Sequence, residues 1–248
     1  MFSTYQDIFD HRGKAYHHAM SLSPKARRQE FSLAIEVARI SDGDVVCDAP
    51  SGGGYLGQSL PPELNIQMIE VDPSEVFSRG PARGRAKIHQ APLNDIPLAS
   101  DSCDAVVSIA GLHHEKDRVE VFRELRRLIR PGGRLCILEV AKDSIVDPFL
   151  NQFVHATNSM GHAGEFVDDS FRSELAVAEF LMQRDELFEY TWDFRDEQSM
   201  VEFVQLLFGL DKATPDQVLR GISRHLGYRC DEAGECHMNW ALQAIVCV

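Results

Sequence analysis

The chain lacks any long apolar run, and no stretch approaches the roughly eighteen consecutive apolar residues of a membrane-spanning helix. Its first twenty residues, MFSTYQDIFDHRGKAYHHAM, carry charges early and have no apolar centre like that of a secretion signal. The six cysteines form no CxxC pair, and three of them fall inside apolar runs. We therefore expect a cytoplasmic protein without membrane insertion, in which the thiols are buried and reduced.

Basic residues are also scarce. The 248 residues include 38 acids against 25 lysines and arginines, which gives a net charge of −13. Nineteen of these acids, but only seven of the bases, lie in residues 143–248. Because an acidic surface repels phosphate backbones, and no basic groove can be traced in the sequence, we expect no nucleic-acid partner. The composition leaves open whether the protein is a monomer or a homodimer.

Short apolar runs alternate with helical or glycine-rich segments through the first part of the chain. The runs are residues 44–49, 65–72, 86–92, 103–110 and 134–141. Between the last two runs, an amphipathic helix is predicted from the spacing of Val121, Phe122, Leu125, Leu128 and Ile129, and it ends before Pro131, Gly132 and Gly133. This alternation predicts an α/β fold with a mostly parallel sheet covered on both faces.

The rest of the chain departs from this alternation. Residues 143–226 are mainly helical in pattern and have seven phenylalanines scattered from Phe149 to Phe194, so we predict a helical cap or lid over the carboxyl edge of the sheet. The final segment, LGYRC, DEAGE and CHMNWALQAIVCV, predicts two strands joined by a turn at Gly234. The expected fold is a single domain over residues 1–248, with a seven-stranded sheet that ends in an antiparallel hairpin.

The stretch VVCDAPSGGGYLGQSLP, residues 45–61, follows a strand with three successive glycines. Gly52, Gly54 and Gly57 fit the spacing GxGxxG of dinucleotide-binding loops. Asp48, however, closes the strand four residues before Gly52, and a carboxylate there would repel a pyrophosphate. A ligand that carries an ammonium and a sulfonium would instead be attracted. In an open parallel sheet this loop lies at the switch point where ligands bind.

With these residues the chain resembles the class I S-adenosylmethionine-dependent methyltransferases, over about residues 30–141 and the terminal hairpin. VVCDAPSGGG and IEVDPS stand at the family's first two strand ends. DIPLASDSCDAVVSIAGLHH and FRELRRLIRPGGRLCILEV are similar to its later motifs. The resemblance implies a doubly wound, Rossmann-like fold. The chain departs from the family at Pro50, which replaces a loop glycine, and at Ala91 and Pro92, where many members have an acid that reaches the adenine.

The resemblance implies a set of residues that bind S-adenosylmethionine. The methionine half would be lined by Asp48, Ala49, Pro50, Ser51, Gly52 and Gly54. Asp72, followed by Pro73, would accept hydrogen bonds from the ribose hydroxyls, and Leu93 would lie near the adenine. Ala110 and Gly111 would approach the sulfonium. Residues 1–22, with Tyr16 and Arg12, would fold over the cofactor.

The expected reaction is methyl transfer by in-line displacement to a small, apolar or neutral acceptor, since the predicted cap is rich in phenylalanine and poor in basic residues. His113 and His114 follow the fourth strand and are the candidate catalytic residues, because imidazole transfers protons near neutral pH. His17, His18, His155, His162 and His237 are further candidates. No recognised zinc-ligand spacing is present, so we predict no metal site.

Two alternatives remain open from the sequence. An NAD(P)-dependent oxidoreductase would explain GxGxxG and the acid Asp72 twenty residues beyond Gly52. A protein that binds S-adenosylmethionine for regulation, or for chemistry other than methyl transfer, would explain the departures at Pro50 and Ala91.

Overall fold

The five apolar runs form five parallel strands in a computed structural model that describes residues 4–79 and 86–248. The strand order is β3-β2-β1-β4-β5-β8-β6, and the short strand β7 pairs with β8 outside this path. The strands are β1 (Val45–Asp48), β2 (Gln67–Asp72), β3 (Lys87–Gln90), β4 (Cys103–Ile109), β5 (Ile129–Glu139), β6 (Met182–Phe194), β7 (Tyr228–Cys230) and β8 (Cys236–Cys247). The predicted doubly wound α/β fold is confirmed, but the described residues form a sheet of eight strands rather than the predicted seven, because β6 adds an edge strand that the sequence pattern did not indicate.

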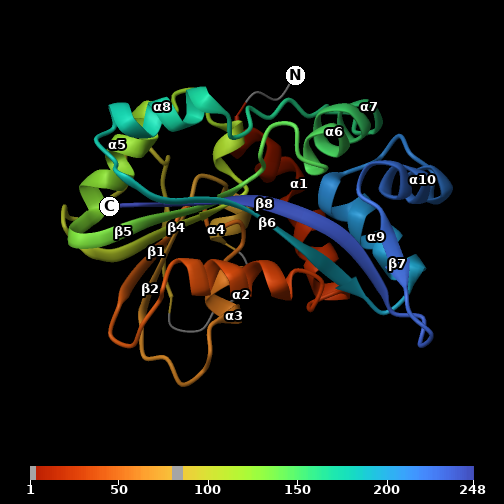
Figure 1. Cartoon of the computed structure of the whole chain (residues 1–248), viewed down its shortest axis with the longest axis horizontal. Helices are drawn as coiled ribbons and strands as arrows, with labels where there is room; N and C mark the ends of the chain where they lie inside the picture. Colours follow the sequence, from red (N-terminus) through yellow and green to blue (C-terminus); the bar gives the residue numbers. More distant parts are fainter. Residues whose placement is uncertain (1–3, 80–85) are drawn as a thin grey trace.

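Helices cover both faces of the sheet and one end of it (Figure 1). α5 (Arg118–Leu128) and α8 (Asp169–Val177) pack together on one face, while α2 (Arg28–Val37) and α3 (Tyr55–Ser59) lie on the other. At the carboxyl ends of the parallel strands gather α1 (Tyr5–Leu22), α4 (Glu75–Ser78), α6 (Val146–Pro148), the π-helical turn η2 (Phe149–Val154), α7 (His155–Thr157), α9 (Glu197–Phe208) and α10 (Pro215–His225).

The core follows from the strand composition. The central strands β4 and β5 carry fully buried apolar side chains toward both faces, as expected for parallel strands covered by helices on each side. Phe122 and Leu125 of α5 fill one face, and Phe31 and Ala34 of α2 fill the other. In the described residues no helix is both long enough and apolar enough to cross a membrane.

The prediction of a helical cap over residues 143–226 is wrong for Met182–Phe194, which form β6. This thirteen-residue strand pairs antiparallel with β8 along almost its whole length. It lies at the edge of the sheet, and most of its first eight residues are exposed and several charged, a composition that protects an edge strand from pairing with other chains. Because this composition hides the apolar alternation of a strand, the sequence pattern missed β6.

The terminal hairpin is present, but its first strand, β7, has only three residues. The main partners of β8 are β5 and β6, with Ile137 opposite Ile245 and Phe188 opposite Leu242. Cys230 and Cys236 form a disulfide across the hairpin, so the expectation of reduced thiols is wrong for this pair. The other four cysteines are free and buried.

A buried ion pair joins the N-terminal helices to β6. Arg27, which precedes α2, donates to the Glu30 carboxylate, with 2.9 Å between Nε and Oε1, and also to the Tyr16 hydroxyl. The other Glu30 oxygen accepts hydrogen bonds of 3.0 Å from the Tyr190 hydroxyl and from the Trp192 indole. Glu30 is fully buried and Arg27 nearly so. Although burial lowers the pKa of Arg27, the Glu30 carboxylate raises it above its ordinary value.

We expect Glu30→Ala to lower the free energy of unfolding by about 3–5 kcal/mol, because it leaves the buried Arg27 charge without a partner. Urea denaturation measures this loss. The matched control is Glu120→Ala, which breaks an exposed pair with Arg123 and should cost at most about 1 kcal/mol. Equal losses for the two variants would show that the buried pair does not hold these elements together.

Candidate functional site

Four segments converge at the carboxyl ends of the parallel strands. They are the glycine loop after β1, Asp72 at the end of β2, the turn η1 (Leu112–His114) after β4, and Glu139 at the end of β5. The strand order reverses between the paired strands β1 and β4. From β1 the chain proceeds to β2 and β3 on one side, and from β4 it proceeds to β5 on the other side. Such a switch point is where open α/β sheets bind ligands.

The glycine loop holds three successive residues in the left-handed region, with φ of 54° at Gly52, 106° at Gly53 and 70° at Gly54. Residues other than glycine rarely adopt these φ angles, so the conformation of the loop requires glycine at all three positions. The loop also touches the turn after β4. A Cβ added to Gly111 would lie 2.4 Å from Cγ of Pro50, which shows how closely these two segments approach.

Asp72 anchors the glycine loop to β2. Its Oδ2 accepts a hydrogen bond of 2.8 Å from the Gly52 amide and one of 3.2 Å from the Tyr5 hydroxyl, and its Oδ1 accepts one of 2.9 Å from the Ser74 amide. Burial, and then the Asp72 charge, raise the pKa of Tyr5 well above its ordinary value. The helix α1 therefore lies over the loop at this carboxylate.

Two adjoining pockets share Tyr16, Arg27, Gly52 and Ile109. The smaller one lies against the glycine loop and is also lined by Asp48, Pro50 and Ser51. The larger one extends under the helices at the end of the sheet. Its wall is mostly aromatic, with side chains from α1, α4, β6, α9 and β8: Tyr5, Phe9, Phe77, Trp192, Phe208 and Trp240. Trp192 and Trp240 stack with ring centroids 4.2 Å apart.

Arg12 gives the aromatic pocket a positive charge. Its Nη2 donates a hydrogen bond of 2.6 Å to the carbonyl of Leu207, whereas its buried Nε has no hydrogen-bond partner in the described part of the chain. Burial lowers the pKa of Arg12 to about 10, and Asp211 opposes this effect. The guanidinium is therefore charged at neutral pH and can donate to a bound oxygen.

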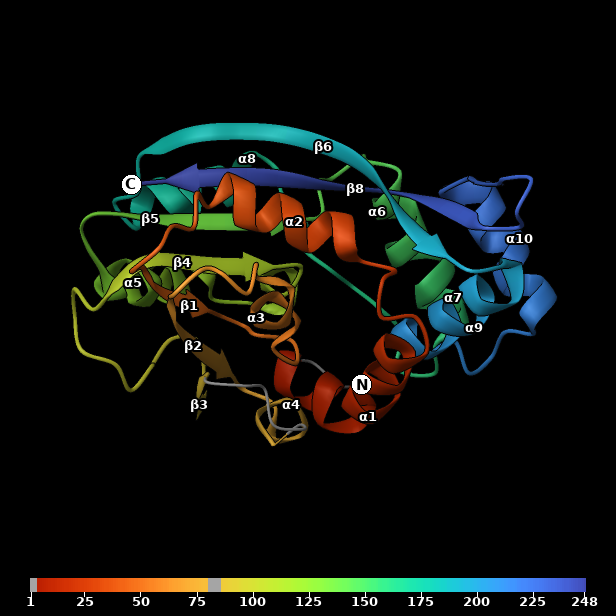
Figure 2. The same ribbon diagram turned by 90° about the horizontal axis from the view of Figure 1, so that it is seen from below.

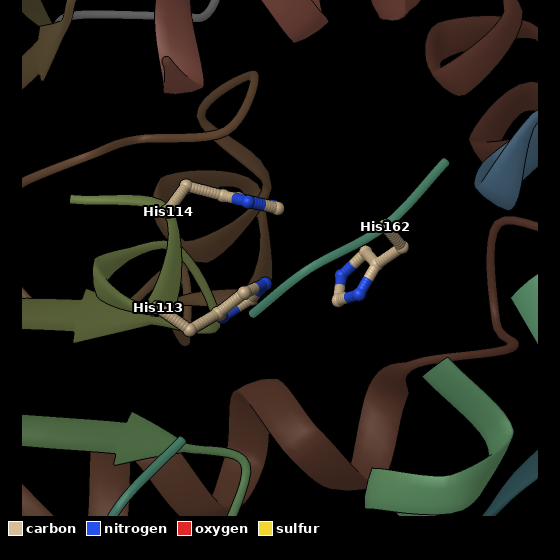
Figure 3. Close-up of side chains that lie close together, drawn as sticks. All are labelled: His113, His114 and His162. Carbon is tan, nitrogen blue, oxygen red and sulfur yellow. The ribbon is translucent and has the colours of Figure 1, made fainter. Parts of the chain in front are cut away.

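Three histidines also line this pocket and lie close together. His113 and His114 come from η1, and His162 comes from the segment between α7 and α8 (Figure 3). Burial, followed by the electrostatic interaction with His113, lowers the pKa of both His114 and His162 well below the ordinary value. Both imidazoles are therefore neutral near pH 7. No spacing in the sequence linked His162 to the pair, since 48 positions separate it from His114.

The predicted site residues divide into two groups. The pockets are lined by Tyr16, Asp48, Pro50, Ser51, Gly52, Ala110, His113 and His114. The linings do not include Ala49, Gly54, Asp72, Pro73, Leu93 and Gly111, all within the described residues. Among these, Leu93 is buried in the apolar core, whereas Asp72 and Gly111 support the loops that form the pocket. The cofactor contacts of both groups remain predictions.

The sequence reasoning missed several pocket residues. Arg27, Glu30, Trp192 and Trp240 line the aromatic pocket, and Glu139 lies behind His113. Trp192 and Trp240 lie within β6 and β8, where a buried aromatic residue is a strand signal rather than a site signal. The sequence indicates a special role only for Glu30 and Glu139. These acids lie within helix and strand patterns, and a charge buried there requires hydrogen-bond partners.

Comparison with known proteins shows similarity to methyltransferases. Residues 47–137 match a family model described as a methyltransferase domain. Two relatives named ubiquinone/menaquinone biosynthesis C-methyltransferase UbiE are similar: that of Syntrophotalea carbinolica is 30% identical over 47% of this chain and 52% of its own, and that of Geotalea daltonii is 35% identical over 46% and 53%. The chain thus spans about half the length of these curated relatives.

Solved structures extend the likeness to the fold of nearly the whole chain. The YcgJ protein from Bacillus subtilis matches with a TM-score of 0.64 at 15% identity, covering 88% of this chain and 97% of its own. The [4+2]-cyclase SpnF matches with a TM-score of 0.64 at 16% identity, covering 98% and 96%. Together with the glycine loop, these likenesses show that the chain has the Rossmann-like fold of class I methyltransferases. The match to the methyltransferase domain model covers residues 47–137, less than half of the chain.

We expect His113 and His162 to be protonated on Nδ1 rather than Nε2. Each Nδ1 faces an oxygen acceptor, Glu139 at 2.8 Å and Asn151 at 2.9 Å, and the hydrogen bond made by one ring nitrogen sets the tautomer. Long-range ¹H–¹⁵N spectra of the imidazoles at neutral pH report the protonated nitrogen. The exposed His18 serves as the reference ring, and protonation of Nε2 in His113 or His162 would contradict this assignment.

Proposed function

We propose that this chain transfers the methyl group of S-adenosylmethionine to a small, largely apolar molecule held in the aromatic pocket. The observation that carries the proposal is the junction at Gly52, where the glycine loop meets the aromatic pocket. On one side of this residue lie the acids Asp48 and Asp72, and on the other lie aromatic rings and histidines. A donor site and an acceptor site are therefore adjacent.

The residues beside the loop fit the cofactor. Asp48 is 2% exposed and lines the smaller pocket, so its carboxylate would face a cationic group. Ser51 and Gly52 would bind the methionine part through their backbone, and Asp72 would bind the ribose hydroxyls once the Tyr5 hydroxyl is displaced. Ala110 lines the larger pocket next to Gly52, where the methyl group would emerge. S-adenosylmethionine supplies an activated methyl group on a sulfonium.

The larger pocket favours an acceptor with a flat, apolar body and one polar end. Its aromatic rings offer surfaces for stacking, and Arg12 offers an unpaired N–H. Of the two arginines in the described lining, Arg27 is paired with Glu30, so the pocket offers little positive charge to a polyanion. The name of the curated relatives, C-methyltransferases of ubiquinone and menaquinone biosynthesis, describes acceptors of this general kind, and it supports an aromatic or conjugated acceptor here.

The chain's own contribution would be alignment, exclusion of water and proton removal. α1 and α9 close the pocket from one side, and their packing excludes water from the reacting groups. The aromatic wall would hold the acceptor in line with the donor. His113 and His114 border the same pocket, and their imidazoles would accept the proton of an acceptor that arrives protonated.

We expect S-adenosylmethionine or its demethylated product to bind with micromolar affinity, and NADH not to bind. The acid Asp48 at the loop attracts a sulfonium and repels a pyrophosphate. Calorimetric titration of the whole chain with each ligand measures both affinities. Binding of NADH without binding of S-adenosylmethionine would overturn the proposal in favour of an oxidoreductase. Mass spectrometry of the purified protein would identify any retained acceptor.

We expect Asp72→Ala to weaken the binding of S-adenosylmethionine by about 1–3 kcal/mol, roughly 5- to 150-fold, as charge-assisted hydrogen bonds are lost. Glu75→Ala, an exposed acid of the neighbouring helix α4, is the control and should leave the affinity unchanged. Asp72→Asn keeps one oxygen for the Gly52 amide. Full affinity in Asp72→Asn would show that Asp72 acts only through the loop, without binding the ribose.

A further inference from the structure

We propose that His113, His114 and His162 form a binding site for a divalent transition-metal ion in the wall of the aromatic pocket. One ring nitrogen from each residue lies within 4.8 Å of the other two. Figure 3 shows the three rings converging from two separate segments of the chain. Imidazole nitrogen is a ligand that Zn²⁺, Fe²⁺, Ni²⁺ and Cu²⁺ accept readily, so the chemistry of the cluster fits this class of ion.

His113 is held in the form that a metal requires. Its Nδ1 lies 2.8 Å from Oε1 of Glu139, which is fully buried. The same carboxylate also accepts hydrogen bonds from the backbone amides of Leu112 at 3.0 Å and Val140 at 2.8 Å. With Nδ1–H donated to Glu139, the lone pair of Nε2 remains available. A carboxylate behind a histidine is the usual support of a metal-binding imidazole.

His162 is held in the same form by an amide. The orientation of Asn151 is fixed by Gly164, because its Nδ2 donates to the Gly164 carbonyl at 3.0 Å and its Oδ1 accepts from the Gly164 amide at 2.9 Å. This Oδ1 lies 2.9 Å from Nδ1 of His162, so the histidine must be the donor. Its Nε2 is therefore unprotonated. The Glu139 carboxylate and the Asn151 amide thus both leave Nε2 of the neighbouring histidine available to a metal ion.

His114 completes the cluster. Its ring centroid lies 4.0 Å from that of His113 and 5.3 Å from that of His162. No side-chain hydrogen bond of His114 is observed with the described residues, so its ring can turn toward an ion. The segments also approach closely, since a Cβ on Gly164 would lie 2.9 Å from Cδ2 of His113. Metal–nitrogen bonds of about 2.0–2.1 Å place the nitrogens of a tetrahedral site about 3.3 Å apart, so the rings must close by at most about 1.5 Å.

The charges around the cluster indicate what such an ion would do. Imidazole ligands carry no negative charge, so only Glu139 behind His113 would compensate the charge of the ion, and the Arg12 guanidinium lines the same pocket. Three protein ligands also leave a coordination position open, as in catalytic rather than structural sites. An ionised oxygen of the acceptor would satisfy both cations. This use of the ion rests on the proposed function, whereas binding of the ion does not.

Metal titration of the chain alone tests the site. The untagged, chelator-treated protein is titrated with Zn²⁺ by calorimetry and with Co²⁺ by visible absorption, in the absence of S-adenosylmethionine. We expect one ion per chain, and His162→Ala or His114→Ala should weaken its binding by more than about 100-fold. Asn151→Ala, which removes only the support of His162, should weaken it by about 10- to 100-fold.

Controls separate this result from loss of folding and from failure of the proposed function. Thermal unfolding confirms that each variant is folded, and His18→Ala, an exposed histidine of α1, should retain wild-type metal binding. Stoichiometric binding that survives both His162→Ala and His114→Ala, or the lack of any binding by the wild-type chain, would overturn the proposal. S-adenosylmethionine binding measured in parallel reports on the proposed function independently.

Discussion

The buried carboxylate of Glu30 requires several donors, and they come from Arg27 close to it in sequence and from the distant edge strand β6. A charge removed from water is tolerated only when its oxygens are fully hydrogen-bonded. Glu30 meets this condition through Arg27 beside it and through Tyr190 and Trp192 of β6. Arg27 in turn reaches the Tyr16 hydroxyl of α1. Helices α1 and α2 and the edge strand β6 are therefore linked at one point, which is also part of the wall of the aromatic pocket.

This link explains why the edge strand belongs to the site. β6 is longer than the central strands β1 and β4, and with β8 it extends past them under the helices at the end of the sheet (Figure 2). Its exposed half carries charges, while its last residues place Trp192 against Trp240 and Phe203. The first residues of β6 thus form an exposed edge of the sheet, and its last residues form part of the aromatic wall of the pocket.

The parts of the fold that could be predicted are those set by local pattern. Strands β1 to β5 and the helix α5 were identified because continuous apolar runs and one apolar helix face need no knowledge of distant contacts. The glycine loop, Asp72 and the two histidines of η1 were found because each directly follows a strand. β6 was missed because its exposed half is polar, and the Cys230–Cys236 disulfide was missed because spacing alone does not identify a pair. His162, Glu139 and the Arg27–Glu30 pair enter the site only through tertiary contacts, which no local pattern records.

The fold that this chain shares with other proteins does not determine the reaction. A cyclase and the YcgJ protein match this fold with the same TM-score, so the sheet and its loops do not by themselves fix a reaction. Much of the aromatic pocket lies outside the matched residues 47–137: α1 with Arg12, the segment bearing His162, and the tryptophans of β6 and β8. On the proposed function, these residues would select the acceptor, whereas the glycine loop would bind the cofactor. The three histidines join the two parts of the pocket, since His113 and His114 lie within the matched residues and His162 lies beyond them.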